Sequence, residues 1–135
     1  RIWKKQTGIN RISFEHPSQI SDYYMEDMRH LEQEEIRVMF LNTKQGLIKD
    51  LLISRGTVNA SVMTPREILI EALRCCAVSM VLVHNHPSGD VTPSPEDKEL
   101  TKRLAMLGGM MQLCLTDHII VGDSDFFSFR QAGLI

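Results

Sequence analysis

Two histidines and an aspartate in the segment VLVHNHPSGDVTPSPED have the residue types and the spacing of a metal site. His84 and His86 stand one residue apart where an apolar run ends, and alternate residues of a strand point to the same side. Asp97 falls in the first turn of the next expected helix, and the loop over residues 87–93 is long enough to fold that turn back over the histidines. Two imidazoles and one carboxylate would leave a fourth position for water, as in catalytic rather than structural zinc sites.

Each part of this pattern also has a structural explanation. Two histidines at the end of a strand are about as often core or surface residues as metal ligands. Ser94 is a candidate helix cap, and a carboxylate at Asp97 is favourable near the positive end of a helix dipole. The combination of His-x-His, seven residues, Ser, two residues and Asp favours the metal site, because the whole set is hard to obtain by chance.

The surrounding sequence predicts helices and strands in alternation. Helices are expected over residues 17–31, capped by Ser18, from the cap Thr64 to Cys76, and from Ser94 to Leu107, closed by Gly108 and Gly109. Strands are expected over residues 34–41, 47–54, 77–84, 110–122 and 126–130. The strand over 77–84 is almost continuously apolar, which is typical of burial on both faces. The sequence therefore predicts a layered α/β fold, close to α+β, with a mixed central sheet flanked by helices.

Length and composition indicate one domain. A chain of 135 residues that is 43% hydrophobic can bury a core without metals or disulfides. We expect residues 1–16 to form an extended N-terminal segment or linker remnant, and residues 17–135 to form the domain. The net charge of −2 gives no support for a nucleic-acid partner, and the basic stretch RIWKKQTGINR is interpreted as a solvated terminal segment.

The cysteines and the apolar runs bear on the compartment. Cys75, Cys76 and Cys114 are odd in number and form no CxxC, so we expect buried thiols in a reducing, cytoplasmic environment. No apolar run approaches the length of a membrane span, and no signal peptide opens the chain. The sequence leaves the oligomeric state open.

These motifs resemble a known family. HNHPSGDVTPSPED contains the metal motif of the JAMM (MPN+, Mov34/JAB) metalloproteases and deubiquitinating isopeptidases. The segments RGTVN, PREI, HNHPSG, PSPED and DHIIVG, in this order, are similar to the bacterial RadC-like branch, and the similarity covers about residues 32–135. The resemblance implies the JAB1/MPN, cytidine-deaminase-like fold and zinc-dependent hydrolysis of an amide bond in a peptide or protein substrate.

The resemblance also implies roles for individual residues. It makes His84, His86 and Asp97 the zinc ligands, and Ser94 the residue that hydrogen-bonds the reaction centre. The family's general base is a glutamate on an upstream strand, for which Glu34 and Glu35 are the candidates.

At most one of the two glutamates can point into the site, because adjacent strand residues face opposite ways. We favour Glu34, which lies on the same side as the apolar residues Ile36, Val38 and Phe40. The alternative is that both glutamates are solvated charges at the start of a strand.

Other roles stay open at this stage. His118 is a candidate for a residue behind the ligands or in the cleft, and equally for a structural histidine beside Asp117, while Asn85 and Ser88 are further candidates near the site. A zinc nucleoside deaminase would show HxE and PCxxC, which this sequence lacks. The main alternative to a hydrolase is a non-catalytic interaction module that binds a metal. A DNA-repair role is attached to the RadC name only, and zinc is favoured by the resemblance, since these donors suit several metals.

Overall fold

The computed structural model describes residues 13–56 and 63–135. The basic stretch at the start of the chain, and most of the expected N-terminal segment 1–16, lie outside the described residues. The division into a segment 1–16 and a domain 17–135 therefore stays a prediction.

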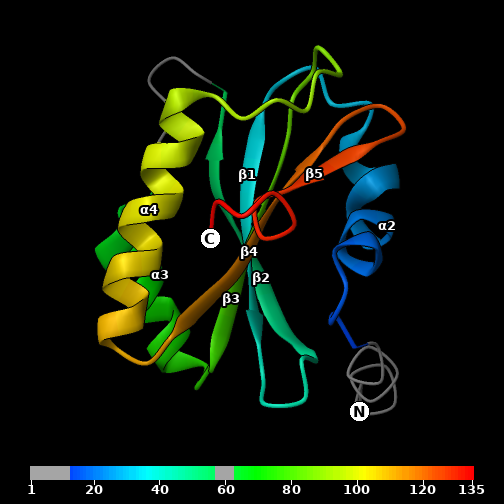
Figure 1. Cartoon of the computed structure of the whole chain (residues 1–135). Helices are drawn as coiled ribbons and strands as arrows, with labels where there is room; N and C mark the ends of the chain where they lie inside the picture. The colour runs from blue at the N-terminus through cyan, green and yellow to red at the C-terminus, as the bar shows by residue number, and fades with distance from the viewer. Residues whose placement is uncertain (1–12, 57–62) are drawn as a thin grey trace.

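A mixed five-stranded sheet forms the centre of the described chain (Figure 1). Neighbouring strands are antiparallel except for the parallel pair β3 and β4, and the order across the sheet is β2-β1-β3-β4-β5. This arrangement confirms the mixed sheet. The strands are β1 (Glu35–Leu41), β2 (Leu47–Arg55), β3 (Ser79–Asn85), β4 (Cys114–Val121) and β5 (Phe126–Ser128).

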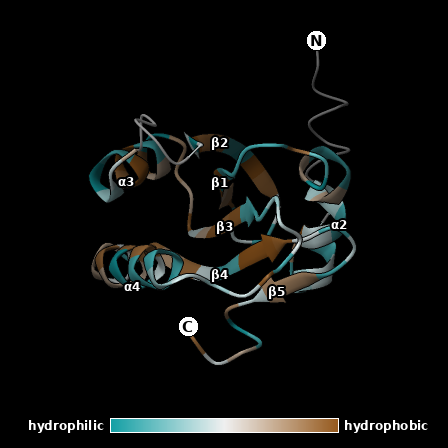
Figure 2. Ribbon diagram, turned by 90° about the horizontal axis from the view of Figure 1, so that it is seen from above, coloured by the Kyte–Doolittle hydropathy of each residue, from teal (hydrophilic) through white to brown (hydrophobic). Residues whose placement is uncertain are grey.

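Helices cover both faces of this sheet. Helices α3 (Pro65–Arg74) and α4 (Pro95–Met110) lie on one side, and α2 (Pro17–Met28) lies on the other (Figure 2). Of the helices that the structure describes, none is long and apolar enough to cross a membrane. The chain is thus a layered α+β structure, as expected.

The central strand β3 is buried along its whole length, which confirms the expectation for its apolar run. Met80 and Leu82 belong to the hydrophobic cluster that also contains residues of α3 and α4. Val81 and Val83 belong to the cluster that contains residues of α2. Because both sides of β3 are packed, the polar side chains at its end are held on a rigid support.

Two helix boundaries differ from the sequence predictions. Helix α2 starts at Pro17, as expected, but it ends at Met28 instead of Leu31, and its cap is His16 instead of Ser18. The Gln19 side chain accepts a hydrogen bond from the His16 backbone N–H at 2.9 Å, so the cap depends on a residue pair and not on Ser18.

Helix α4 continues through both glycines to Met110. A Cβ on Gly108 would collide with the carbonyl oxygen of Leu113, so this glycine serves a close approach of the following turn and does not end the helix. The left-handed turn instead occurs at Gln112, with φ of 58°.

The expectation of buried thiols was wrong for two of the three cysteines. Cys76 and Cys114 are exposed, and Cys75 is partly buried. Cys76 has φ of 58° in the turn after α3, outside the helix face that packs on the sheet.

Candidate metal centre

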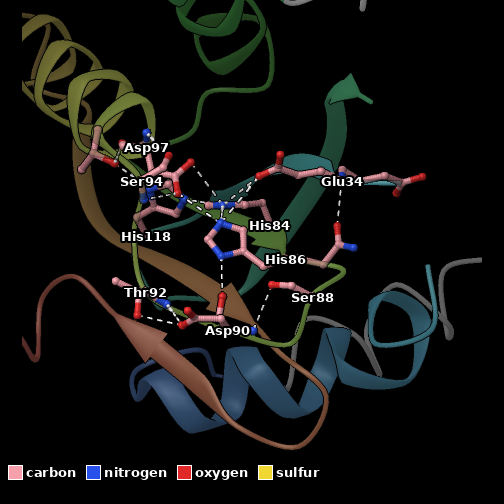
Figure 3. Close-up of polar contacts among 12 residues, drawn as sticks. Glu34, His84, His86, Ser88, Asp90, Thr92, Ser94, Asp97 and His118 are labelled. Atoms are coloured by element: carbon pink, nitrogen blue, oxygen red, sulfur yellow. Dashed lines mark hydrogen bonds and ion pairs between the residues drawn. The ribbon is translucent and has the colours of Figure 1, made fainter. Parts of the chain in front are cut away.

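Four side chains from three parts of the fold meet at the carboxyl end of β3 (Figure 3). Glu34 precedes β1, His84 and His86 lie at and just after the end of β3, and Asp97 lies in the first turn of α4. Each offers one ligand atom, and these atoms all lie within 4.8 Å of one another. The structure thus brings together the three residues predicted as ligands and the glutamate predicted as base.

The spacing of these atoms fits one small cation. The two Nε2 atoms of His84 and His86 lie 2.9 Å apart, and the Asp97 carboxylate lies 3.3 Å from the first and 3.2 Å from the second. In a tetrahedral zinc site with bonds of about 2.0–2.1 Å, neighbouring ligand atoms lie roughly 3.3 Å apart. Glu34 Oε1 lies 3.4 Å and 3.7 Å from the same two nitrogens, within reach of a metal or of a water in the fourth position.

His86 is held in one tautomer by the backbone. Its Nδ1 lies 2.7 Å from the carbonyl oxygen of Asp90, which can only accept a hydrogen bond. Nδ1 therefore carries the hydrogen, and in the neutral ring Nε2 presents a lone pair to the other ligand atoms.

The loop that supplies this carbonyl is ordered by its own side chains. The Ser88 hydroxyl accepts a hydrogen bond from the Asp90 N–H at 3.2 Å, which places Ser88 in the loop structure as well as at the cleft. The loop also packs against Gly122, where a Cβ would lie 2.8 Å from the Gly89 carbonyl oxygen and 2.8 Å from Val91 Cγ1. A side chain at position 122 would push the loop away from the histidines.

His84 is fully buried and has a second histidine behind it. Its Nδ1 lies 2.6 Å from Nε2 of His118, and His118 Nδ1 lies 2.5 Å from the Thr101 hydroxyl. Burial, followed by the nearby His84, lowers the pKa of His118, which is therefore neutral at pH 7. His118 stacks on Phe129 with ring centroids 4.5 Å apart, so it lies behind the ligands and away from the cleft.

Asp117 supports this region through the backbone. Its carboxylate accepts hydrogen bonds from the His118 and Arg130 N–H groups and from the Ser128 hydroxyl, at 2.7, 3.0 and 2.6 Å. These contacts orient the end of the sheet and leave both ring nitrogens of His118 for His84 and Thr101. Sequence reasoning missed Thr101; the available signal was its position one helical turn after Asp97.

Ser94 and Asp97 form a capping box at the start of α4. The Ser94 hydroxyl accepts from the Asp97 N–H at 3.0 Å, and the Asp97 carboxylate accepts from the Ser94 N–H at 2.8 Å. The structure therefore confirms the capping explanation, and the same carboxylate also faces the histidines. Within the described chain, the Ser94 hydroxyl donates to no acceptor, so its proton can be directed into the cleft.

Asp97 is buried, with only 6% of the residue exposed. Burial by itself would raise its pKa, but the contact with His84 and the two contacts with Ser94 outweigh burial and hold the pKa below its usual range. Asp97 is therefore ionised at neutral pH, as a metal ligand must be.

The neighbouring glutamates have different surroundings. Glu35 is buried and bonds Arg55 at 2.8 Å and Arg37 at 3.2 Å, whereas Glu34 is partly buried and faces the histidines. The alternative of two solvated charges is therefore wrong.

Asn85 explains how Glu34 is held. Its side chain accepts from the Glu35 N–H at 2.7 Å and donates to the Gln33 carbonyl at 3.1 Å, so it fixes the backbone on both sides of Glu34. Asn85 acts from the far side of the strand and does not line the cleft described below.

A cleft of about 770 Å³ opens beside the four ligand residues. Ile36, Pro87 and Leu100 give it an apolar part, and Glu34 and Glu96 give it acidic edges. Among the described residues that line it, none is a lysine or an arginine. Its acidic edges would repel a phosphate group.

Comparison with known proteins identifies the family. Residues 14–134 match the model of the RadC-like JAB domain, and the chain belongs to this family. A UPF0758 protein of Shouchella clausii is 42% identical over 130 residues, which are 96% of this chain and 56% of the relative. UPF0758 proteins of Geobacillus thermodenitrificans and Bacillus cereus are 44% identical over 131 and 126 residues, or 96% and 93% of this chain and 58% and 56% of theirs. The chain thus spans little more than half the length of these relatives.

Proposed function

We propose that this chain is a zinc-dependent metallohydrolase that cleaves an amide bond, as a metallopeptidase or isopeptidase. The observation that carries the proposal is the convergence of two imidazoles and two carboxylates at one point, with a cleft beside them. Three of these groups would hold the metal, and the fourth would remain for proton transfer.

The chemistry is divided between the metal and the protein. A bound zinc ion would supply Lewis acidity, which lowers the pKa of a coordinated water from 15.7 toward ~7. Glu34 would take the proton of the attacking water and pass it to the leaving amine. The Ser94 hydroxyl would donate a hydrogen bond to the developing oxyanion, a contact that contributes about 3 kcal/mol to lowering the barrier in other hydrolases.

The cleft supports a peptide or protein substrate. Its apolar part can hold a side chain beside the scissile bond, and its acidic edges would repel phosphate groups. A net charge of −2 also disfavours binding to a nucleic-acid backbone, so nothing here supports DNA as the substrate. Zinc is proposed over other divalent ions because of the family, since two histidines and a carboxylate suit several metals.

The glutamate pair allows a controlled experiment. We would measure bound metal by mass spectrometry, and hydrolysis of a peptide and isopeptide library, for the parent protein, Glu34→Gln and Glu35→Gln. We expect one zinc per chain in all three proteins, with kcat reduced about 100-fold or more only in Glu34→Gln. Glu35→Gln is the matched control, because its side chain binds Arg37 and Arg55 instead of facing the metal residues.

Three results would contradict parts of the proposal. A parent without stoichiometric metal would exclude the metal centre. A metal-loaded parent that cleaves nothing in the library would exclude the hydrolase and favour the interaction module. Loss of zinc from Glu34→Gln would make Glu34 a ligand rather than the base.

A further inference from the structure

A buried chain of hydrogen bonds runs from helix α4 to the candidate metal centre. It consists of Thr101 in α4, His118 in β4 and His84 in β3, and these residues are 2%, 0% and 0% exposed. The contacts are 2.5 Å from Thr101 to His118 and 2.6 Å from His118 to His84. Because water is excluded along the chain, each hydrogen must be shared between these groups.

Thr101 determines which group donates and which accepts in each of these hydrogen bonds. Its hydroxyl donates its single hydrogen to the carbonyl oxygen of Asp97, one turn earlier in the helix, at 2.8 Å. The oxygen of Thr101 is then the acceptor for His118, whose Nδ1 must carry a hydrogen. An imidazole that has its single N–H at Nδ1 has a bare Nε2, so the Nε2 of His118 is the acceptor that faces His84 Nδ1.

We infer that Thr101 and His118 are positioning residues, which hold His84 in the tautomer that has its hydrogen on Nδ1 and its lone pair on Nε2. In this tautomer His84 directs Nε2 at His86 and Asp97, where the proposed zinc would bind. The inference rests on the proposed metal centre and adds how the tautomer of its buried ligand, His84, is set.

The two ligand histidines make the inference specific. His86 binds a carbonyl oxygen, which can only accept, so its tautomer needs no further support. His84 instead binds a second imidazole, which can donate or accept, so its tautomer depends on the next partner, Thr101. Removing the Thr101 oxygen should therefore weaken metal binding from a position whose side chain contacts the backbone carbonyl of Asp97 but none of the atoms that would bind the metal.

The experiment compares threonine variants by zinc affinity in competition with a chelating dye. We expect Thr101→Val to bind zinc about 10–100-fold more weakly than the parent, as for the loss of other groups that orient metal ligands. Thr101→Ser keeps the hydroxyl and should bind within about twofold to threefold of the parent. Thr116→Val is the matched control, because the Thr116 hydroxyl in β4 bonds the Met80 carbonyl at 3.2 Å and no histidine.

A spectroscopic measurement tests the tautomers directly. In the zinc-loaded parent labelled with ¹⁵N, the imidazole spectra should show the Nδ1–H form for both His84 and His118. The Nε2–H form of His118 would overturn the inference, as would a Thr101→Val protein that is folded by circular dichroism and binds zinc like the parent. A parent that takes up no zinc would overturn the proposed function and this inference together, whereas a normal parent with an unaffected Thr101→Val would overturn the inference alone.

Discussion

The starts of α3 and α4 are the same local structure in two different surroundings. Thr64 and Ser94 each precede a proline. Their backbones are nearly identical, with φ of −74° and ψ of 160° at Thr64 and φ of −79° and ψ of 164° at Ser94. Each hydroxyl accepts the N–H of the acid three residues later, at 3.2 and 3.0 Å. In turn, the carboxylates of Glu67 and Asp97 accept a hydrogen bond from the backbone N–H of the cap residue, at 3.1 and 2.8 Å.

What differs is the structure around each cap. Glu67 is exposed, and its carboxylate also takes the Thr64 hydroxyl hydrogen at 3.1 Å. Asp97 is buried against the end of β3, 3.3 Å from His84 Nε2, and leaves the hydroxyl hydrogen of Ser94 available. A capping box is therefore a local device, and it becomes part of a metal centre only where the fold brings ligands to it.

The largest expected difference between the two caps is in metal binding. Asp97→Ala removes a carboxylate ligand and should weaken zinc binding by more than ~100-fold, since loss of a residue that only orients a ligand already costs 10–100-fold. Glu67→Ala removes the corresponding capping acid and should leave zinc affinity unchanged. A chelator competition assay measures both, and equal affinities in the two variants would contradict the ligand role of Asp97.

The second difference concerns the hydroxyl groups. Ser94→Ala and Thr64→Ala should each lower the free energy of unfolding by about 1 kcal/mol through loss of the cap. Only Ser94→Ala should also lower kcat, by roughly 100-fold, if its hydroxyl stabilises the oxyanion. Urea unfolding and turnover of a cleaved library peptide separate the two effects, and Ser94→Thr should retain most of the activity. Equal kcat in Ser94→Ala and the parent would show that Ser94 acts only as a helix cap and does not stabilise the oxyanion.

The smallest expected effect is on acid stability. The folded-state pKa of Asp97 lies below the unfolded value of about 3.9, so the ionised carboxylate stabilises the fold above that value. This contribution, on the order of 1 kcal/mol, is lost as the pH falls through the folded pKa. The stability advantage of the metal-free parent over Asp97→Asn should therefore shrink between pH 5 and pH 2. Urea titrations across this range measure it, and a constant difference would show that Asp97 does not carry the effect.

Much of the fold followed from local patterns. Thr64 and Ser94 were predicted as helix caps because a capping residue and the proline that follows it are adjacent in the chain. The burial of β3 was predicted because a strand packed on both faces needs an uninterrupted apolar run. The predicted end of α4 was wrong. Gly108 is required because the carbonyl oxygen of Leu113 lies close to it, and the rules for helix ends do not include such a contact.

The candidate site was predicted in part for the same reason. The histidine pair was expected to converge because alternate strand residues share a side, and the two Nε2 atoms lie 2.9 Å apart. The preference for Glu34 used the same alternation. The environment of Glu35 could not be predicted, because Arg55 lies on another strand and is brought beside it by the pairing of β1 with β2.

The sequence by itself determined which groups could bind a metal and which local structures present them, because strand alternation and helix capping depend on residues a few positions apart. Only the tertiary structure decided how close the Asp97 carboxylate comes to the two histidines, and that Thr101 reaches His84 through His118. These contacts join residues from separate strands and helices, and their distances are set by the packing of α4 against the sheet. A metal centre needs ligand atoms placed to within a few tenths of an ångström, and that precision comes from the packed core.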